Sequence, residues 1–165
     1  MRIAFDEHVA PKLADAIKAL SGEEGILRVE IVSARQYAIP KAKSDAPWLE
    51  QFSRDGGKVV ISGDARMRGK LHEQKALVEA GFIVIFFSRR WNNLNAYSKS
   101  AMLIKWWPVI LAAIESAAPG QCFEIPCSWR GNKLKEVTPP GSKRKKPGPK
   151  PKDETGSTSE KDAAS

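Results

Sequence analysis

Three aspartates stand where chemistry is expected, because each lies at the end or the entrance of a regular element. Asp6 ends a first apolar run, Asp45 precedes a Pro-Trp helix start, and Asp64 ends a second apolar run after a Ser-Gly pair. The carboxyl edge of an open α/β sheet is where such sheets bind ligands. Carboxylates that converge there repel one another unless a cation neutralises them. The pattern predicts a divalent-metal site, and hard oxygen ligands favour Mg²⁺ or Mn²⁺.

Metal-assisted hydrolysis of phosphodiesters suits such a set of residues. The cation lowers the pKa of a water molecule, stabilises the phosphate oxygens and aligns the leaving group, so the protein mainly supplies carboxylates. We therefore interpret Asp6, Asp45 and Asp64 as metal ligands and catalytic residues, and Glu7 as a fourth catalytic candidate. No catalytic histidine or cysteine is required.

Each acid also has a structural interpretation. Asp45 is equally suited to be an N-cap, Asp6 and Glu7 can cap the first helix, and Asp64 can be a turn residue. Taken together the acids favour a site, because Asp64 follows a strand that should be buried on both faces.

Basic residues follow two of the strand ends and fill the C-terminus. They can bind phosphates next to the acids, although a solvated helix entrance or a solubilising tail remains the alternative. Residues 138–165 hold seven Lys or Arg and four Asp or Glu, so +3 of the net charge of +8 lies there and +5 lies on residues 1–137. Both parts favour a polyanionic partner. The nucleic-acid-binding candidates are Arg66, Arg68, Arg89, Arg90, Lys143, Arg144, Lys145 and Lys146.

Apolar runs alternate with helical patterns along residues 1–118, which predicts an α/β domain with a mostly parallel sheet. Residues 119–137 form an extension with an extra strand or hairpin near residues 122–125, and the Pro, Gly, Ser and charge-rich residues 138–165 are expected to be disordered. Strands are expected at residues 2–5, 27–32, 58–62 and 82–87. Helices are expected at residues 9–20 with Pro11 in the first turn, from Pro47 to Phe52, and at residues 71–80 and 96–118.

The tryptophans are expected to pack rather than to bind bases. Trp106 and Trp107 point about 100° apart on a helix, so one core should not take both, and the second is expected in a dimer contact or in a groove for a partner protein. Trp91 is the better candidate for stacking on a base, with packing still favoured.

The remaining features indicate the cellular setting. Cys122 and Cys127 do not form a disulfide framework and are expected to be reduced thiols. The chain shows no signal peptide and no run long enough to cross a membrane, which favours a cytoplasmic protein without a membrane partner.

At this point the residues support a resemblance to a known family. Asp6-Glu7-His8 after a first strand, the Ser44-Asp45 pair with Trp48 and Leu49 downstream, and the run 59–64 resemble the PIN-like superfamily, and within it the compact branch of VapC-type toxins that begins with an Asp-Glu strand end. The similarity covers roughly residues 1–115.

The resemblance implies an α/β/α sandwich with a central, mostly parallel sheet and a Mg²⁺- or Mn²⁺-dependent endoribonuclease. It further implies an RNA substrate and, for the toxin of a type II pair, a cognate antitoxin; a homodimer stays open. The chain departs from the family where a fourth acid is usual, because Ser88, Arg89 and Arg90 occupy that edge. Ser88 remains a candidate to hold a water at the metal. A non-catalytic nucleic-acid-binding module and a DNA-directed nuclease are the alternatives.

Overall fold

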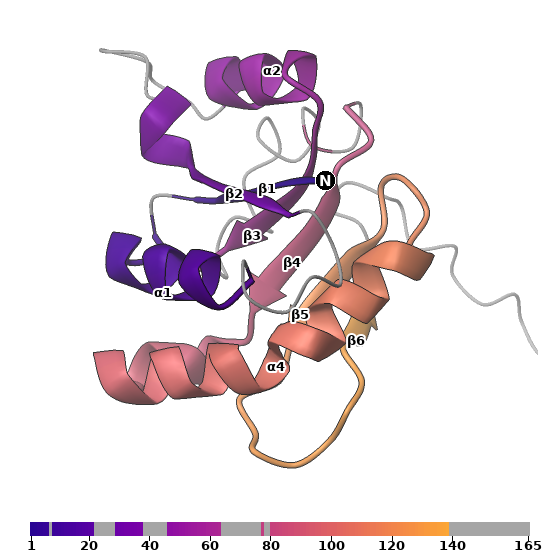
Figure 1. The fold of residues 1–165 in the computed structure, drawn as a ribbon. Coiled ribbons are helices and arrows are strands. Elements are labelled where there is room, and N and C mark those ends of the chain that lie inside the picture. The colour runs from indigo at the N-terminus through magenta and orange to yellow at the C-terminus, as the bar shows by residue number, and fades with distance from the viewer. Residues whose placement is uncertain (7, 22–28, 38–45, 64–76, 78–79, 139–165) are drawn as a thin grey trace, which may run out of the picture.

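The computed structural model describes residues 1–6, 8–21, 29–37, 46–63, 77 and 80–138 (Figure 1). Short apolar runs form the strands, and amphipathic segments between them form the helices. The elements in chain order are β1 (Arg2–Phe5), α1 (Pro11–Ser21), β2 (Glu30–Ser33), the 3₁₀ helix η1 (Ala34–Tyr37), α2 (Ala46–Arg54), β3 (Gly57–Ser62), β4 (Ile83–Phe87), the 3₁₀ helix η3 (Arg89–Asn93), α4 (Ala96–Ser116), β5 (Cys122–Ile125) and β6 (Lys135–Val137).

The strands form one six-stranded sheet in the order β2-β1-β3-β4-β5-β6. All neighbours are parallel except β5 and β6, which are antiparallel. In register, Phe5 lies opposite Ile61, and Ser62 lies opposite Phe86. Because β1, β3 and β4 run in the same direction, the residues that follow them meet at one edge of the sheet.

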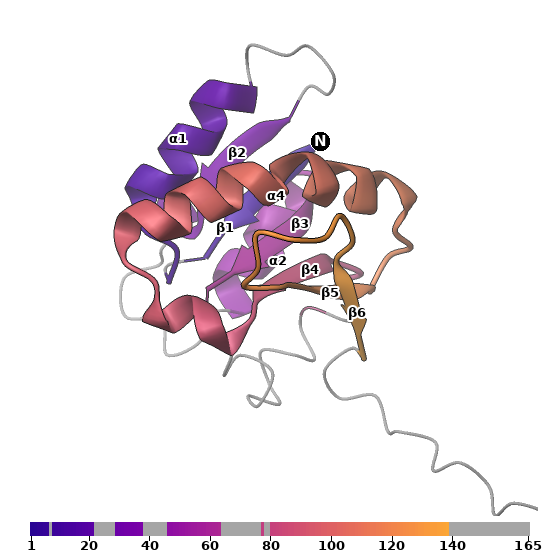
Figure 2. The same ribbon diagram turned by 90° about the horizontal axis from the view of Figure 1, so that it is seen from below.

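Helices cover both faces of the sheet, so the expected α/β/α sandwich with a central, mostly parallel sheet is confirmed. Alternate strand residues face opposite sides. One side packs Phe5, Ile61 and Phe87 against α1 and α4, and the other packs Val60 and Phe86 against α2. Figure 2 shows α1 and α4 lying side by side over the first of these faces.

The expectation that one core cannot take both Trp106 and Trp107 is wrong. Both side chains are buried in the same core. Trp107 stacks with Phe5 of the sheet, at 6.2 Å between ring centroids. The chain beyond β5 packs over Trp106, whose Nε1–H donates to the Ser128 carbonyl at 3.1 Å. The protein's own C-terminal extension therefore covers the face that was assigned to a partner.

Other features agree with the expectations from the sequence. Trp91 is a packing residue, 1% exposed, and its Nε1–H donates to the Ile125 carbonyl at 3.1 Å. Cys122 and Cys127 are both free thiols. Among the helices of the described residues, none combines the length and the apolar character needed to cross a membrane. The tail at residues 139–165 and most of the helix expected at residues 71–80 lie outside the described residues.

Candidate active site at the carboxyl edge of the sheet

Asp6 is the buried acid of this edge, only 3% exposed. It follows β1 and continues the pairing with β3, because its backbone N–H donates to the Ile61 carbonyl at 3.0 Å. The chain then turns toward α1, with the Val9 N–H donating to the Asp6 carbonyl at 3.1 Å. The strand pairing and this turn together fix the backbone of Asp6.

Three donors hold the Asp6 carboxylate. Its Oδ1 accepts the backbone N–H groups of His8 at 3.0 Å and of Gly63 at 3.2 Å, while its Oδ2 accepts the Ser62 hydroxyl. The imidazole Nδ1 of His8 lies 3.7 Å from Oδ2, beyond hydrogen-bond distance. The carboxylate is therefore locked between the ends of β1 and β3, with its orientation set by both strands.

Gly63 allows the two strand ends to approach this closely. A Cβ atom at this position would lie 2.8 Å from the His8 carbonyl oxygen and 3.1 Å from its carbonyl carbon. Cβ atoms essentially never come within 3.0 Å of a heavy atom to which they are not covalently linked. Only glycine at position 63 lets the backbone of His8 lie this close to the Gly63 N–H that donates to Asp6.

Burial raises the pKa of Asp6 above its ordinary value, because the charged form loses solvation. The hydrogen bonds from Ser62, Gly63 and His8 and the charge of His8 oppose this shift without cancelling it. The ionised carboxylate therefore carries an unfavourable solvation free energy in the folded protein, and a cation bound at the edge would offset it.

The raised pKa of Asp6 predicts a pH-dependent effect of Asp6→Asn on stability. The folded protein binds the Asp6 proton more tightly than the unfolded chain, so this group lowers stability as pH rises from its ordinary pKa, about 4, to its folded value. Above the folded pKa, the loss of stability that comes from ionising the buried Asp6 stays at its full value. Asp6→Asn should therefore gain more stability, relative to wild type, at pH 7 than at pH 4 in the presence of chelator.

Urea denaturation at the two pH values measures this difference. Asp15→Asn is the matched control, since Asp15 is exposed on α1. Equal effects of Asp6→Asn at both pH values would contradict the raised pKa.

The groups at this edge suit an oxygen-ligated divalent ion. Among the described residues, two N–H groups donate to Oδ1 of Asp6 and one hydroxyl donates to Oδ2, which leaves Oδ2 with acceptor capacity toward them. The Ser88 hydroxyl, which follows β4 at the same edge, is buried and has no hydrogen-bond partner in the part of the chain that the structure describes. Carboxylate and hydroxyl oxygens are both hard donors of the kind that Mg²⁺ takes.

The structure places only some of the predicted site residues. Arg89 and Arg90 lie in η3 directly after β4 and are exposed, so they are accessible at the edge that holds Asp6. Within the described ranges no three His, Cys, Asp or Glu side chains gather into a metal site. The predicted residues that lie outside those ranges are Glu7, Asp45, Asp64, Arg66, Arg68, Lys143, Arg144, Lys145 and Lys146.

The partners of Asp6 are residues that the sequence reasoning did not assign to the site. Ser62 is the one polar residue at the end of the β-branched run of β3, and a polar residue in a strand buried on both faces needs a hydrogen-bond partner. The sequence alone therefore contained a signal that could have assigned Ser62 to the site. Nothing in the sequence pointed to Gly63 or to the backbone of His8, because their role depends on how β1 and β3 end side by side.

One comparison with known proteins supports a family assignment. A family model described as a PIN like domain matches residues 1–89, which include β1 through β4 and the whole Asp6 environment. Among curated proteins and solved structures, nothing matches the chain.

Proposed function

The chain belongs to the PIN-like domain family, and from that premise we propose that it is a divalent-metal-dependent endoribonuclease that hydrolyses RNA phosphodiesters. The fold is of a nuclease type. The observation that carries the proposal is the Asp6 carboxylate, which is 3% exposed, oriented by three donors, and left with acceptor capacity at the ligand-binding edge of the sheet.

In this proposal Asp6, Asp45 and Asp64 hold the ion, and Glu7 is the fourth acid. A bound Mg²⁺ or Mn²⁺ supplies an acidified water and stabilises charge on the phosphate. Ser62 and the backbone of His8 and Gly63 fix the rotamer of Asp6. Groups that orient a ligand in this way commonly affect metal affinity or activity by about 10–100-fold.

Basic residues bring the RNA backbone to the acids. Arg89 and Arg90 are exposed at the edge where β4 ends and can contact phosphates there. Arg66 and Arg68 follow Asp64 in the sequence and have the same proposed role. The cluster Lys143–Lys146 adds sequence-independent attraction.

At a finer level, we propose that the protein is the toxin of a type II toxin–antitoxin pair, with a cognate antitoxin as its protein partner. The resemblance of the strand end Asp6-Glu7 to VapC-type toxins supports this assignment. A homodimer is not required by the buried tryptophans, since Trp106 and Trp107 are covered by the chain itself.

A second candidate function is a non-catalytic nucleic-acid-binding module. The observation that favours it is the end of β4, where Ser88, Arg89 and Arg90 stand in place of a carboxylate. Such a module would bind RNA without binding a divalent ion at Asp6. Metal binding therefore separates the two functions.

We expect Mn²⁺ to stabilise the folded protein. An ion that binds only the folded state at a hundredfold excess over its Kd raises the free energy of unfolding by about 2.7 kcal/mol. Urea denaturation with increasing Mn²⁺ measures the gain, and Asp6→Asn should lose most of it. Stability that is unchanged at millimolar Mn²⁺ would contradict the metal site and favour the binding module.

A further inference from the structure

A cavity of about 550 Å³ lies beside the Asp6 site, between the beginnings of α1 and α4. It shares two residues with that site, because His8 and Gly63 line the cavity and their N–H groups also bind Asp6. The volume falls within the range of about 300–1,000 Å³ that is usual for small-molecule sites. A ligand in this cavity would therefore be a neighbour of the Asp6 carboxylate.

The floor of the cavity is apolar and rigid. The rings of Phe87 and Trp91 stack at 4.4 Å between centroids with 25° between their planes. Both residues are buried, and the hydrogen bond from Trp91 to the Ile125 carbonyl fixes the indole. Val9 completes this floor. Such a surface suits a flat heteroaromatic ring or a sugar face.

The charged side chains among the described residues of the lining are basic. Lys12 from the first turn of α1 and Lys99 from the first turn of α4 both line the cavity, and none of the described lining residues is Asp or Glu. Neither ammonium group forms an ion pair within the part of the chain that the structure describes. The exposed amide of Asn92 adds a hydrogen-bonding group. The lining therefore favours an anion with an apolar part.

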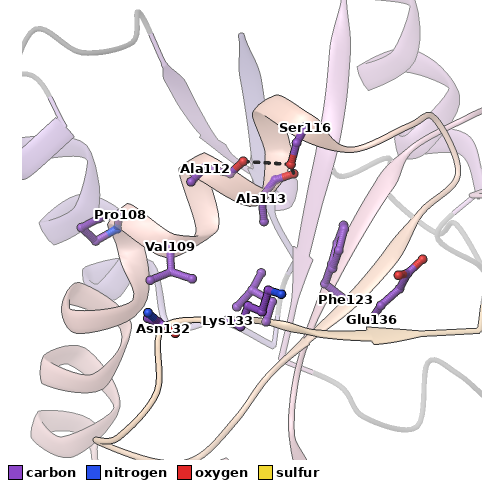
Figure 3. Close-up of a pocket in the computed structure, with 10 residues that line it drawn as sticks. Pro108, Val109, Ala112, Ala113, Ser116, Phe123, Asn132, Lys133 and Glu136 are labelled. Carbon is purple, nitrogen blue, oxygen red and sulfur yellow. Dashed lines mark hydrogen bonds between the residues drawn. The ribbon is translucent and has the colours of Figure 1, made fainter.

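A second cavity differs from the first in the charges of its lining. It measures about 670 Å³ and lies between the C-terminal half of α4 and the chain before β6 (Figure 3). Its lining contains Lys133 and Glu136, whose charges balance, and its Ser116 hydroxyl donates to the Ala112 and Ala113 carbonyls of its own helix. Nothing in that lining selects a ligand.

We propose that the cavity between α1 and α4 binds one nucleotide of the RNA strand, next to the phosphodiester that is cut. Lys12 and Lys99 contact its phosphate, and the Phe87–Trp91 floor supports its base or sugar. This assignment rests on the proposed endoribonuclease function, because it is RNA that brings a nucleotide to this edge. The site needs no metal, since its cations are the two lysines.

The test is binding of adenosine 5′-monophosphate and uridine 5′-monophosphate to the full chain in chelator, measured by isothermal titration calorimetry. Because hydrogen bonds from a charged donor are stronger than those from a neutral amide, Lys12→Gln/Lys99→Gln should weaken binding at least about tenfold. Lys18→Gln is the matched control, because Lys18 is exposed in the last turn of α1 and does not line the cavity. Equal affinities of the double variant and wild type would overturn the proposal.

Further measurements test whether the nucleotide that binds belongs to an RNA strand, and whether each variant is folded. A short single-stranded RNA should compete with the mononucleotide and lose affinity in the same double variant; mononucleotide binding that RNA does not displace would overturn the RNA assignment. Lys99→Glu provides a second variant, which should bind more weakly than Lys99→Gln if the contact is electrostatic. Circular dichroism checks that each variant is folded.

The cavity and the proposed function fail in different ways. If wild type cleaves RNA and the double variant has an unchanged KM, the cavity assignment is wrong and the nuclease stands. If RNA binds in a lysine-dependent manner but is never cleaved, the cavity is a nucleotide-binding site, while its place next to a cut phosphodiester and the nuclease function are both wrong.

Discussion

Asp6→Asn is expected to reduce RNA cleavage by at least about 100-fold while the protein stays folded. The amide replaces an anionic oxygen donor with a neutral one, so the ion loses charge neutralisation at the edge where Asp6 is held. The fold should survive, because an amide oxygen can still accept the N–H groups of His8 and Gly63. The measurement is the initial rate of cleavage of a labelled single-stranded RNA in Mn²⁺.

Two further substitutions, one outside the site and one within it, serve as comparisons for Asp6→Asn. Asp15→Asn removes the same charge from the exposed face of α1 and should keep the wild-type rate. Asp64→Asn should match the loss seen for Asp6→Asn if both acids hold the ion. A folded Asp6→Asn protein that cleaves RNA at the wild-type rate would exclude Asp6 from the active site.

Gly63→Ala should impair both stability and cleavage. The added Cβ would meet the His8 carbonyl oxygen at 2.8 Å, and this neighbour is backbone, so the turn after β1 or the end of β3 must move. Overpacking of this kind typically costs about 1–3 kcal/mol. The movement also displaces the N–H that binds Asp6, and a displacement of about 1 Å can reduce a rate about 100-fold. Thermal unfolding and cleavage rates measure the two effects.

Gly120→Ala controls for loss of stability alone. Gly120 has a φ of +83°, and nothing lies within 4 Å of a Cβ placed there. Alanine is strained at such a φ, yet Gly120 lies in the turn before β5, away from Asp6. We expect a destabilised protein with the wild-type cleavage rate at a temperature where it is folded. If Gly63→Ala behaves in the same way, the close approach does not position Asp6.

The fold was largely predictable because its strands are short, nearly uniform apolar runs. β4 is β-branched or aromatic throughout, and β3 has a β-branched centre at residues 59–61, which indicates strands buried on both faces. Helical patterns between the strands indicate parallel connections. The strand order was not readable, since it depends on how elements pack in three dimensions. The prediction for Trp106 and Trp107 was wrong for the same reason, because the sequence does not show that the chain beyond β5 folds back over Trp106.

The candidate site was predictable only in part. Asp6 stands out in the sequence as an acid directly after an apolar run, and the structure places it at the expected edge. Its orientation depends on Ser62 and Gly63, which reach it only because β1 and β3 pair in register. Lys12 and Lys99 share a cavity for a similar reason: α1 and α4 pack on the same face although they are far apart in the chain.

The termini of the RNA products test the central claim most directly. If water activated at a divalent ion attacks the phosphodiester in line, wild-type protein in Mn²⁺ should leave a linear phosphomonoester on one end and a hydroxyl on the other, and excess chelator should abolish cleavage. Mass spectrometry of a cleaved oligoribonucleotide reads these ends, and a DNA of the same sequence tests selectivity for the sugar. Products with 2′,3′-cyclic phosphate ends, or cleavage that persists in chelator, would contradict a metal-dependent hydrolase at the Asp6 edge.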